Sequence, residues 1–241
     1  MTSPKTTFII IGIDDNAQQE LPEQARNAIA GGFVFSGGKR HHEIMRNNHL
    51  WIDITVPLDD VFRQYKAHSD IVVFASGDPL FFGFANTVRK RLPDAVISVI
   101  PTFNSLQTLA HRLLLPYHDM HVVSLTGRPW HEFDRALIEG QEKIGVLTDR
   151  EHTPTSIAER MLEYGYDNYI IHTGEELGSS TETVRTQSIA EAQATCFRHP
   201  NCLILERTYV RPRPFGIPES EIRDAVAEGW KELAVCRMEM Q

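Results

Sequence analysis

The sequence predicts an α/β protein of two domains, the first built on a largely parallel sheet and the second on a mixed sheet. Short apolar runs rich in β-branched residues recur along the chain, and segments with helical spacing separate many of them. Continuous apolar runs are typical of strands buried on both faces of a parallel sheet. Strands that alternate with helices indicate βαβ units. The 241 residues suffice for two small domains, each with its own core.

Seven segments fit strands, and three segments between them fit helices. The strands are expected over residues 8–13, 70–75, 95–100, 120–125, 143–148, 168–172 and 201–207. The helices are expected over residues 80–91, 104–114 and 153–164. In the third helix Thr153 suits the N-cap, and Pro154 suits the first helical position.

The second half of the chain is less regular than the first. A turn-like segment, LPYHDM (115–120), separates two series of strands and helices, and a further strand over 182–186 follows the turn LGSS. We therefore expect a domain boundary after residue 117. The N-terminal domain then covers residues 1–117, and the C-terminal domain covers residues 118–241.

The composition is typical of a globular cytoplasmic protein. Hydrophobic residues make up 41% and charged residues 23% of the chain. No segment approaches the roughly 20 apolar residues that a membrane helix needs, and the N-terminus lacks the features of a signal peptide. The net charge of −8 makes the chain a poor non-specific partner for nucleic acid, whose binding depends on phosphate neutralisation. A local basic patch for an anion is still compatible with that total.

The cysteines and histidines do not suggest a metal centre. Cys196, Cys202 and Cys236 are an odd number without CxxC spacing, which argues against disulfides and a structural zinc site. We expect all three to be reduced packing residues. His41 and His42 are adjacent, and adjacent side chains on a strand or helix diverge, so a two-histidine site is not expected.

The segment ASGDPLFFG (75–83) directly follows a predicted buried strand and leads into a predicted helix. This places it at the carboxyl end of a strand, where open α/β folds bind ligands. Gly77 lets a ligand approach the backbone closely. Asp78 and Pro79 fit an N-cap and a first helical residue, so a simple capped turn without a ligand explains the same pattern.

The segment PTFNSLQ (101–107) has the same relation to the strand before it, with Asn104 or Ser105 suited to cap the next helix. Two small polar loops in succession favour one shared ligand crevice. The first strand ends in IGIDDN (11–16), where a dinucleotide fingerprint would need GxGxxG and only Gly12 is present. No GxxxxGK[ST] occurs, which excludes a P-loop.

The densest basic cluster is SGGKRHHEI (36–44), and a second cationic position is Arg128 in SLTGRPW (124–130). Lys39, Arg40 and His41 suit contacts with carboxylates, arginine through bidentate pairing. A solvated polar loop is the alternative for this cluster. Arg128 follows a strand at the start of the second domain. The tail arginines, for which a structural or interface role is at least as well supported, are Arg207, Arg211 and Arg213.

A third loop, LTDREHTP (147–154), offers Asp149 and His152 as an acid/base pair, although a helix cap explains the same residues. Neither GxSxG nor HExxH is present, so hydrolase interpretations have little support. No general base is assigned.

The ordered set of these segments resembles the tetrapyrrole (corrin/porphyrin) methylase superfamily over nearly the whole chain. The segments are IIGI, SGGKRHHEI, ASGDPLFFG, PTFNSLQ, SLTGRP, LTDREHTPTSIAERMLEYG, EELGSSTE and NCLILER. Within the superfamily, the basic cluster, the GDPLFFG loop and the LTD…TP…IA run resemble the precorrin-6Y methyltransferase branch. One departure is the first loop, GIDDNAQQE, where many relatives have more glycines.

This resemblance implies the class III methyltransferase fold, with S-adenosylmethionine in the cleft between two α/β domains. It implies methylation of C5 of a corrin precursor in cobalamin biosynthesis, a homodimer, and a separate Rossmann-type subunit for decarboxylation and C15 methylation. The expected substrate contacts are Lys39, Arg40, His41 and Arg128. The expected cofactor contacts are Gly12, Gly77, Asp78, Pro79, Phe81, Asn104, Ser105, Leu147 and Thr148.

Two other hypotheses remain open from the sequence. The same cofactor can serve another acceptor, such as a different tetrapyrrole, a protein side chain or RNA, although the acidic charge weighs against RNA. A module that binds a nucleoside or tetrapyrrole without turnover is the third possibility, supported only by the altered first loop.

Overall fold

The computed structural model describes residues 5–14, 16, 19–39, 41 and 49–210. All elements below lie in the compact unit Met1–Thr208; residues Tyr209–Gln241 are assigned to a second unit. Among the described residues, no helix combines the length and apolar character needed to cross a membrane.

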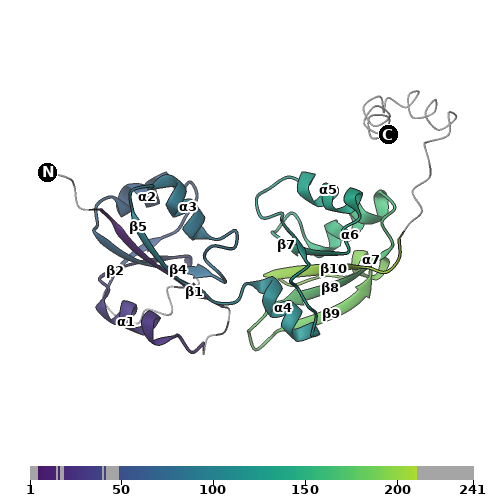
Figure 1. Cartoon of the computed structure of the whole chain (residues 1–241), viewed down its shortest axis with the longest axis horizontal. Coiled ribbons are helices and arrows are strands. Elements are labelled where there is room, and N and C mark those ends of the chain that lie inside the picture. Colours follow the sequence, from purple (N-terminus) through teal and green to yellow (C-terminus); the bar gives the residue numbers. More distant parts are fainter. Residues whose placement is uncertain (1–4, 15, 17–18, 40, 42–48, 211–241) are drawn as a thin grey trace, which may run out of the picture. The chain divides into compact units, whose positions relative to one another are not determined.

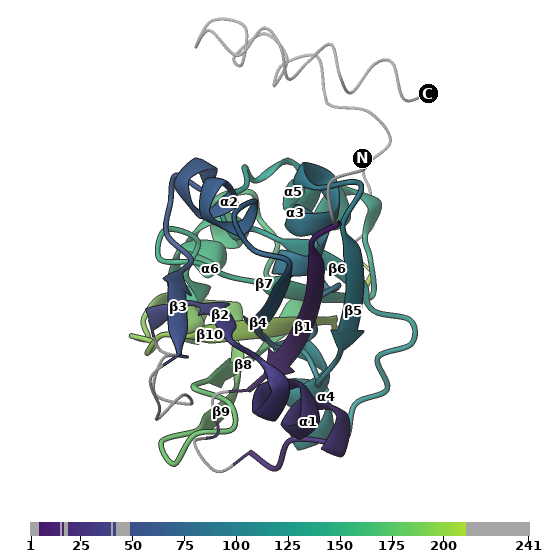
Figure 2. The same ribbon diagram turned by 90° about the vertical axis from the view of Figure 1, so that its left-hand side faces the viewer.

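The first sheet, on the left of Figure 1, is entirely parallel, and Figure 2 shows its strand order β3-β2-β4-β1-β5. Its interior strand β1 (Thr7–Ile13) pairs with the central strand β4 (Asp70–Ser76) and with the edge strand β5 (Val96–Ile100). On the other side of β4 lie β2 (Val34–Gly37) and the edge strand β3 (Leu50–Asp53). Figure 2 shows β1, β4 and β5 running side by side. The carboxyl ends of β1 and β4 therefore meet at one edge of the sheet.

Helices cover both faces of the first sheet (Figure 1). On one face α2 (Asp59–Tyr65) and α3 (Phe84–Arg91) bury an apolar cluster with β1 and β4. On the other face α1 (Glu23–Gly31) packs against a second cluster around Phe35 and Phe74. Burial on both faces explains why β1 and β4 are continuous apolar runs in the sequence.

The second sheet is mixed, with the order β6-β7-β10-β8-β9. Only β6 (His121–Ser124) and β7 (Lys143–Leu147) are parallel. The strand β10 (Asn201–Arg207) runs antiparallel to β7 and to β8 (Tyr169–Glu175), which pairs in turn with β9 (Thr183–Ser188). This confirms the predicted α/β class with one parallel and one mixed sheet.

The second sheet also has helices on both faces (Figure 1). One face packs against α5 (His131–Glu139), α6 (Pro154–Glu163) and α7 (Ile189–Gln193). The other packs against α4 (Ser105–Leu113), where Leu106, Leu109 and Ala110 meet Cys202 and Ile204 of β10. The predicted boundary after residue 117 stays a prediction, and α4, which precedes it, belongs to the core of the second sheet.

The seven principal strands and the strand near 182–186 were predicted correctly, whereas the helix expected over 80–91 begins only at Phe84. Asp78 and Pro79 are therefore not its N-cap and first residue, because Gly83 is the N-cap. The carboxylate of Asp78 accepts a hydrogen bond from Leu80 N at 2.8 Å instead. Such a local bond competes with helix formation. A Cβ at Gly83 would lie 2.4 Å from Pro79 O, so the tight turn requires glycine.

The cysteine prediction is correct for one residue and wrong for another. Cys202 is buried and free, whereas Cys196 is free but exposed, so it is not a packing residue. It lies in the irregular segment after the short helix α7, where its side chain is exposed. Cys236 lies outside the described residues.

Candidate active site

A pocket of about 190 Å³ lies at the carboxyl ends of β1 and β4, beside the amino end of α4. The ends of β7, β8 and β10 supply the rest of its wall. This is the edge at which open α/β sheets bind ligands. Its lining residues are Ile13, Asp14, Ser76, Gly77, Asp78, Phe81, Phe103, Asn104, Ser105, Thr108, Leu147, Gly174, Leu177, Pro200, Asn201 and Cys202.

The turn after β4 forms the first wall. Gly77 has a φ of +61°, a left-handed conformation that glycine adopts without steric cost. Its N–H donates to Ile13 O at 2.7 Å, which ties this turn to the end of β1. Asp78 and Phe81 follow in the lining, whereas Pro79 is buried behind it.

Gly12 does not line the pocket, but it packs against Gly77, which does. A Cβ at this position would lie 2.4 Å from Gly77 O and 2.8 Å from Thr102 N. Real Cβ atoms do not approach backbone atoms so closely, because the repulsion is too strong. Gly12 therefore lets the loops after β1, β4 and β5 close against one another.

The amino end of α4 forms the second wall, where Asn104 and Ser105, two residues that the sequence singled out, line the pocket. Asn104 Oδ1 accepts a hydrogen bond from Gln107 N at 2.9 Å, and Gln107 Oε1 accepts one from Asn104 N at 3.1 Å. This reciprocal capping box satisfies backbone donors that the first turn of a helix leaves unpaired. The cap fixes Ser105 and Thr108 in the lining.

Cys202 contributes an unreactive thiol to the wall. Burial raises its pKa to about 12, and its hydrogen bond with Ser105 opposes this effect only in part. A nucleophilic cysteine needs a thiolate. Cys202 is therefore a packing residue in contact with α4, not a nucleophile.

The second sheet supplies Leu147 to the lining, but Thr148 lies behind it. The Thr148 hydroxyl lies 2.7 Å from Asn201 Oδ1, and Thr148 O accepts a hydrogen bond from Thr126 Oγ1 at 3.1 Å. Asn201 lines the pocket. Thr148 thus orients a pocket residue and does not face the pocket itself.

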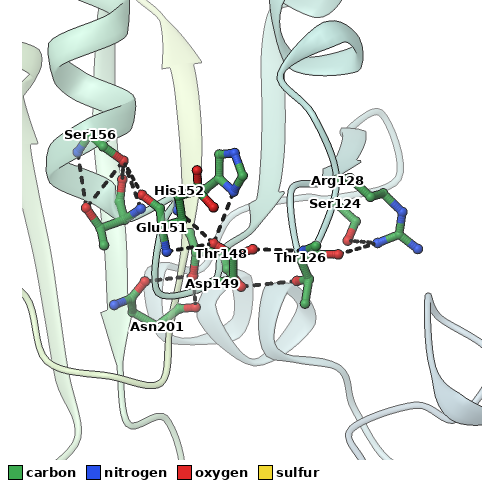
Figure 3. A network of polar contacts seen from close by, with 11 residues as sticks. Ser124, Thr126, Arg128, Thr148, Asp149, Glu151, His152, Ser156 and Asn201 are labelled. Carbon is green, nitrogen blue, oxygen red and sulfur yellow. Dashed lines mark hydrogen bonds and ion pairs between the residues drawn. The ribbon is translucent and has the colours of Figure 1, made fainter. Parts of the chain in front are cut away.

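Asp149 organises the loop between β7 and α6 (Figure 3). Its carboxylate accepts hydrogen bonds from the backbone N–H groups of His152 at 2.7 Å, Glu151 at 2.9 Å and Gly127 at 2.8 Å. Burial of the carboxyl favours its neutral form, but these bonds and the contact with the His152 ring outweigh it and lower the pKa of Asp149 to about 2.

His152 is buried, with Nδ1 3.0 Å from Asp149 Oδ1 and its ring against Trp130. Thr153 caps α6 through Ser156, as predicted. Of the two interpretations open for Asp149 and His152, this geometry favours the structural one.

The basic cluster after β2 is described only in part. Lys39 is exposed, and His41 is buried with Nε2 3.4 Å from the hydroxyl of the pocket residue Ser76. Arg40 and His42 lie outside the described residues. The substrate role of the cluster stays a prediction.

Arg128 is exposed on the loop after β6 (Figure 3). Its Nη1 donates to Ser124 Oγ at 2.7 Å and to Thr126 O at 3.1 Å. Its guanidinium carbon lies 5.3 Å from the centroid of the Phe82 ring. Arg207, in contrast, bonds Gly140 O and Glu142 at the end of β10, a structural role; Arg211 and Arg213 lie outside the described residues.

The sequence did not single out most of the wall from the second sheet. It also did not single out Ile13, Asp14, Ser76 and Phe103, although they lie within the loop segments that it identified. The antiparallel pairing that brings Glu175 opposite Asn201 is non-local, so no spacing in the sequence reveals it. Thr108 carried a usable signal, because it lies one helical turn after Asn104. The missed lining residues are Ile13, Asp14, Ser76, Phe103, Thr108, Gly174, Leu177, Pro200, Asn201 and Cys202.

Glu175 holds part of that missed wall in place. Its carboxylate is 1% exposed, accepts hydrogen bonds from Arg185 Nε at 2.8 Å and from Arg198 N at 2.6 Å, and lies between the pocket residues Gly174 and Leu177 in sequence. A buried carboxylate is tolerated when charges and hydrogen bonds compensate it. Glu175 therefore connects the end of β8 to the segment before Pro200.

Fold and pocket together define a two-sheet α/β protein with a pocket at the carboxyl edge of its parallel sheet. Residues 8–193 match the family described as Tetrapyrrole (Corrin/Porphyrin) Methylases, and the chain belongs to this family.

Two relatives, both named methyltransferases, are similar to this chain over about three quarters of its length. The precorrin-6Y C(5,15)-methyltransferase [decarboxylating] of Sinorhizobium sp is 31% identical over 188 residues, which cover 75% of this chain and 45% of the relative. This chain thus spans about half the length of that relative. The cobalt-precorrin-7 C(5)-methyltransferase of Salmonella typhimurium is 24% identical, with 77% of this chain and 92% of the relative covered.

The uroporphyrin-III C-methyltransferase of Thermus thermophilus, solved with S-adenosylhomocysteine, has a TM-score of 0.63 and 20% identity over 88% of this chain and 96% of that one. At this identity the likeness shows the fold.

Proposed function

We propose that this chain is a C-methyltransferase that uses S-adenosylmethionine to methylate C5 of a corrin precursor in cobalamin biosynthesis. The observation that carries the proposal is the pocket around the left-handed Gly77, which loops of the parallel sheet and strand ends of the mixed sheet line together. Membership of the family and the names of the two relatives support the choice of reaction.

The lining fits a folded sulfonium nucleoside. Apolar side chains suit the adenine ring and the aliphatic arm, while small polar groups suit the ribose hydroxyls and the amino-acid end. A Cβ at Gly77 would lie 3.3 Å from Asn104 Cα, so glycine lets the turn after β4 lie close to the amino end of α4 in the pocket wall. The apolar group is Phe81, Phe103, Leu147 and Leu177, and the polar group is Asp14, Asn104, Ser105, Thr108 and Asn201.

The bound cofactor supplies an electrophilic methyl group, and the protein's task is alignment. The loops at Gly77 and Asn104 fix the cofactor relative to the acceptor carbon, and the apolar wall excludes water. Orientation of two reactants contributes up to about 7–11 kcal/mol to lowering a barrier in favourable cases. An electron-rich carbon in a reduced tetrapyrrole therefore needs no strong protein base for methyl transfer.

We assign substrate recognition to the basic residues that the sequence singled out. The acceptor carries carboxylates, and Lys39, Arg40 and Arg128 supply the complementary charge in a chain of net charge −8. His41 is placed with them because it contacts Ser76 beside the pocket.

The C5 step is favoured for the matched region. That region corresponds to about half of the relative named for both C5 and C15 chemistry, and to nearly all of the relative named for C5 alone. A cytoplasmic chain of two domains, with the boundary after residue 117, is part of the proposal and rests on the sequence patterns alone. The homodimer and the separate decarboxylating C15 methyltransferase rest on the resemblance.

The test combines binding and turnover. Isothermal titration with S-adenosylhomocysteine is expected to show one site per chain, which Gly77→Val abolishes. Incubation with S-adenosylmethionine and cobalt-precorrin-7 or its metal-free counterpart is expected to yield a product heavier by one methylene unit in mass spectrometry. Binding without turnover on any corrin intermediate would point to another acceptor, and absence of cofactor binding would contradict the proposal.

A further inference from the structure

An exposed aromatic ring and an arginine meet beside the pocket. Phe82 directly follows the pocket residue Phe81, and the two rings pack edge to face with centroids 5.3 Å apart. The guanidinium carbon of Arg128 lies 5.3 Å from the centroid of the Phe82 ring, within the range of a cation–π contact. Phe82 belongs to the loop after β4 and Arg128 to the loop after β6, so the pair links loops of both sheets.

Phe82 occupies this position in a strained conformation. Its φ is 53°, a left-handed value that a bulky residue rarely adopts, and its side chain is 47% exposed. Strained residues persist where the surrounding structure fixes them, and they cluster at ligand sites. Leu80 and Phe103, from the two loops of the pocket, are also large apolar residues left more than half exposed. The loops thus present an apolar rim to solvent.

Arg128 uses only one of its three side-chain nitrogens, Nη1, in hydrogen bonds to residues that the structure describes. Its Nη1 donates to Ser124 Oγ and Thr126 O, whereas Nε and Nη2 donate to none of the residues that the structure describes. A guanidinium presents its donors in a rigid fork that matches a carboxylate. The stacked, half-anchored arginine therefore retains donors for an anionic ligand.

We propose that Phe82 and Arg128 form one recognition unit for a flat macrocycle with carboxylates at its periphery. The Phe82 ring contacts the face of the macrocycle and holds the guanidinium in place, and Arg128 pairs with one peripheral carboxylate. This inference rests on the proposed function and deepens it, because it makes Phe82 a specificity determinant for the acceptor. The two side chains are expected to depend on each other.

The experiment is a double-mutant cycle on binding of uroporphyrin III, a flat polycarboxylate tetrapyrrole, followed by fluorescence in the presence of S-adenosylhomocysteine. Phe82→Ala and Arg128→Ala are each expected to weaken binding by about fivefold or more. The affinity of the double variant for uroporphyrin III is expected to be at most about twofold below that of the single variant with the lower affinity. Removal of either side chain already abolishes the contact between the two, so the two effects are not expected to add. Phe82→Trp keeps a stacking surface and is expected to bind within about twofold of the wild type.

Matched controls separate this effect from general surface changes. Phe33→Ala removes a ring that is 83% exposed away from the pocket, and Arg63→Ala removes an exposed arginine of α2. Both are expected to leave uroporphyrin binding unchanged. All variants are expected to retain S-adenosylhomocysteine affinity within about twofold, since Phe82 and Arg128 do not line the pocket.

The inference is wrong if Phe82→Ala binds the macrocycle like the wild type, or if the two single effects multiply in the double variant. It is also wrong if the wild type binds S-adenosylhomocysteine but not uroporphyrin III. Failure of the wild type to bind S-adenosylhomocysteine would instead refute the proposed function, on which the inference depends.

Discussion

At the scale of single residues, the shape of the pocket depends on glycines at which a Cβ atom would clash with neighbouring backbone. Gly12 packs against the pocket residue Gly77: a Cβ added to Gly12 would lie 2.4 Å from Gly77 O. The resemblance implied both glycines as cofactor contacts, but the sequence did not show that the loops after three strands meet at Gly12. Close approach between loops is a tertiary property, and a single sequence does not reveal it.

Gly12→Ala is therefore expected to lower the free energy of unfolding by about 1–3 kcal/mol, the usual cost of overpacking, and to weaken S-adenosylhomocysteine binding at least tenfold. Chemical denaturation and calorimetric titration measure the two effects. Gly31→Ala is the matched control, because a Cβ there meets nothing within 4 Å at the end of α1. That variant is expected to be neutral or slightly stabilising, by up to about 1 kcal/mol. Equal effects of the two substitutions would contradict this account of Gly12.

Asp149 gives the fold a specific dependence on acid. The pKa of its carboxyl is about 2 in the folded chain because the backbone hydrogen bonds outweigh burial, and it is higher in the unfolded chain. A lowered folded-state pKa stabilises the fold fully above the unfolded-state pKa, and this contribution is lost as the pH falls from about 4 towards 2.

Asp149→Asn is expected to lower the free energy of unfolding by about 1–2 kcal/mol near neutral pH, the usual contribution of hydrogen bonds to a charged group. The difference from the wild type is expected to shrink between pH 4 and pH 2. Urea unfolding at a series of pH values measures it. Asp94→Asn removes an exposed carboxylate before β5 and is expected to change stability by less than about 0.5 kcal/mol. A constant difference between Asp149→Asn and the wild type across this range would count against the interpretation.

At the scale of elements, the sequence predicted the strands and helix ends that depend on neighbouring residues in the chain. The buried strands β1, β4, β7 and β10 are long apolar runs, and the caps of α4 and α6 are visible in the sequence as Asn104 and Thr153. The sequence did not reveal β2 and β3, which have only four residues each, nor the largely polar helix α1, nor the helices α2, α5 and α7. Short strands and polar helices form because neighbours cover them, so the determining contacts lie elsewhere in the chain.

The capping box of α4 joins helix stability to the pocket. Asn104→Ala removes the side-chain acceptor for Gln107 N, and loss of such a cap costs about 1 kcal/mol of stability. Because Ser105 and Thr108 follow the cap in the lining, S-adenosylhomocysteine affinity is expected to fall at least fivefold as well. Ser188→Ala removes an equivalent capping box from α7, which does not contribute to the pocket. It is expected to cost similar stability and no affinity, and a loss of affinity in both variants would show that capping acts only through global stability.

At the scale of the whole molecule, the pocket is lined by residues of two sheets, whose strands the sequence shows as two successive groups of strands and helices. The second sheet reaches the pocket through the ends of β7, β8 and β10, and α4 belongs to that sheet's core while its first turn lines the pocket. A bond between Arg112 of α4 and Glu182 connects this helix to the turn after β8, where Glu182 also accepts from Gly178 N at 2.6 Å. The sequence predicted both sheets but not these connections, since charged pairs distant in sequence have no periodic signature.

The buried carboxylate of Glu175 is expected to hold the part of the pocket wall that the second sheet supplies. Glu175→Gln keeps the shape of the side chain but removes the charge that compensates Arg185 and the strong acceptor for Arg198 N, so unfolding is expected to become easier by about 2–4 kcal/mol. Affinity for S-adenosylhomocysteine is expected to fall at least tenfold, because Leu177 and Pro200 lose their common support. Glu139→Gln breaks only an exposed pair with Arg135, for which at most about 0.5 kcal/mol is expected and no change in affinity. If Glu175→Gln lost stability yet bound the cofactor product normally under conditions where it is fully folded, the wall would be set by its backbone pairing alone, and the carboxylate would serve the fold without shaping the site.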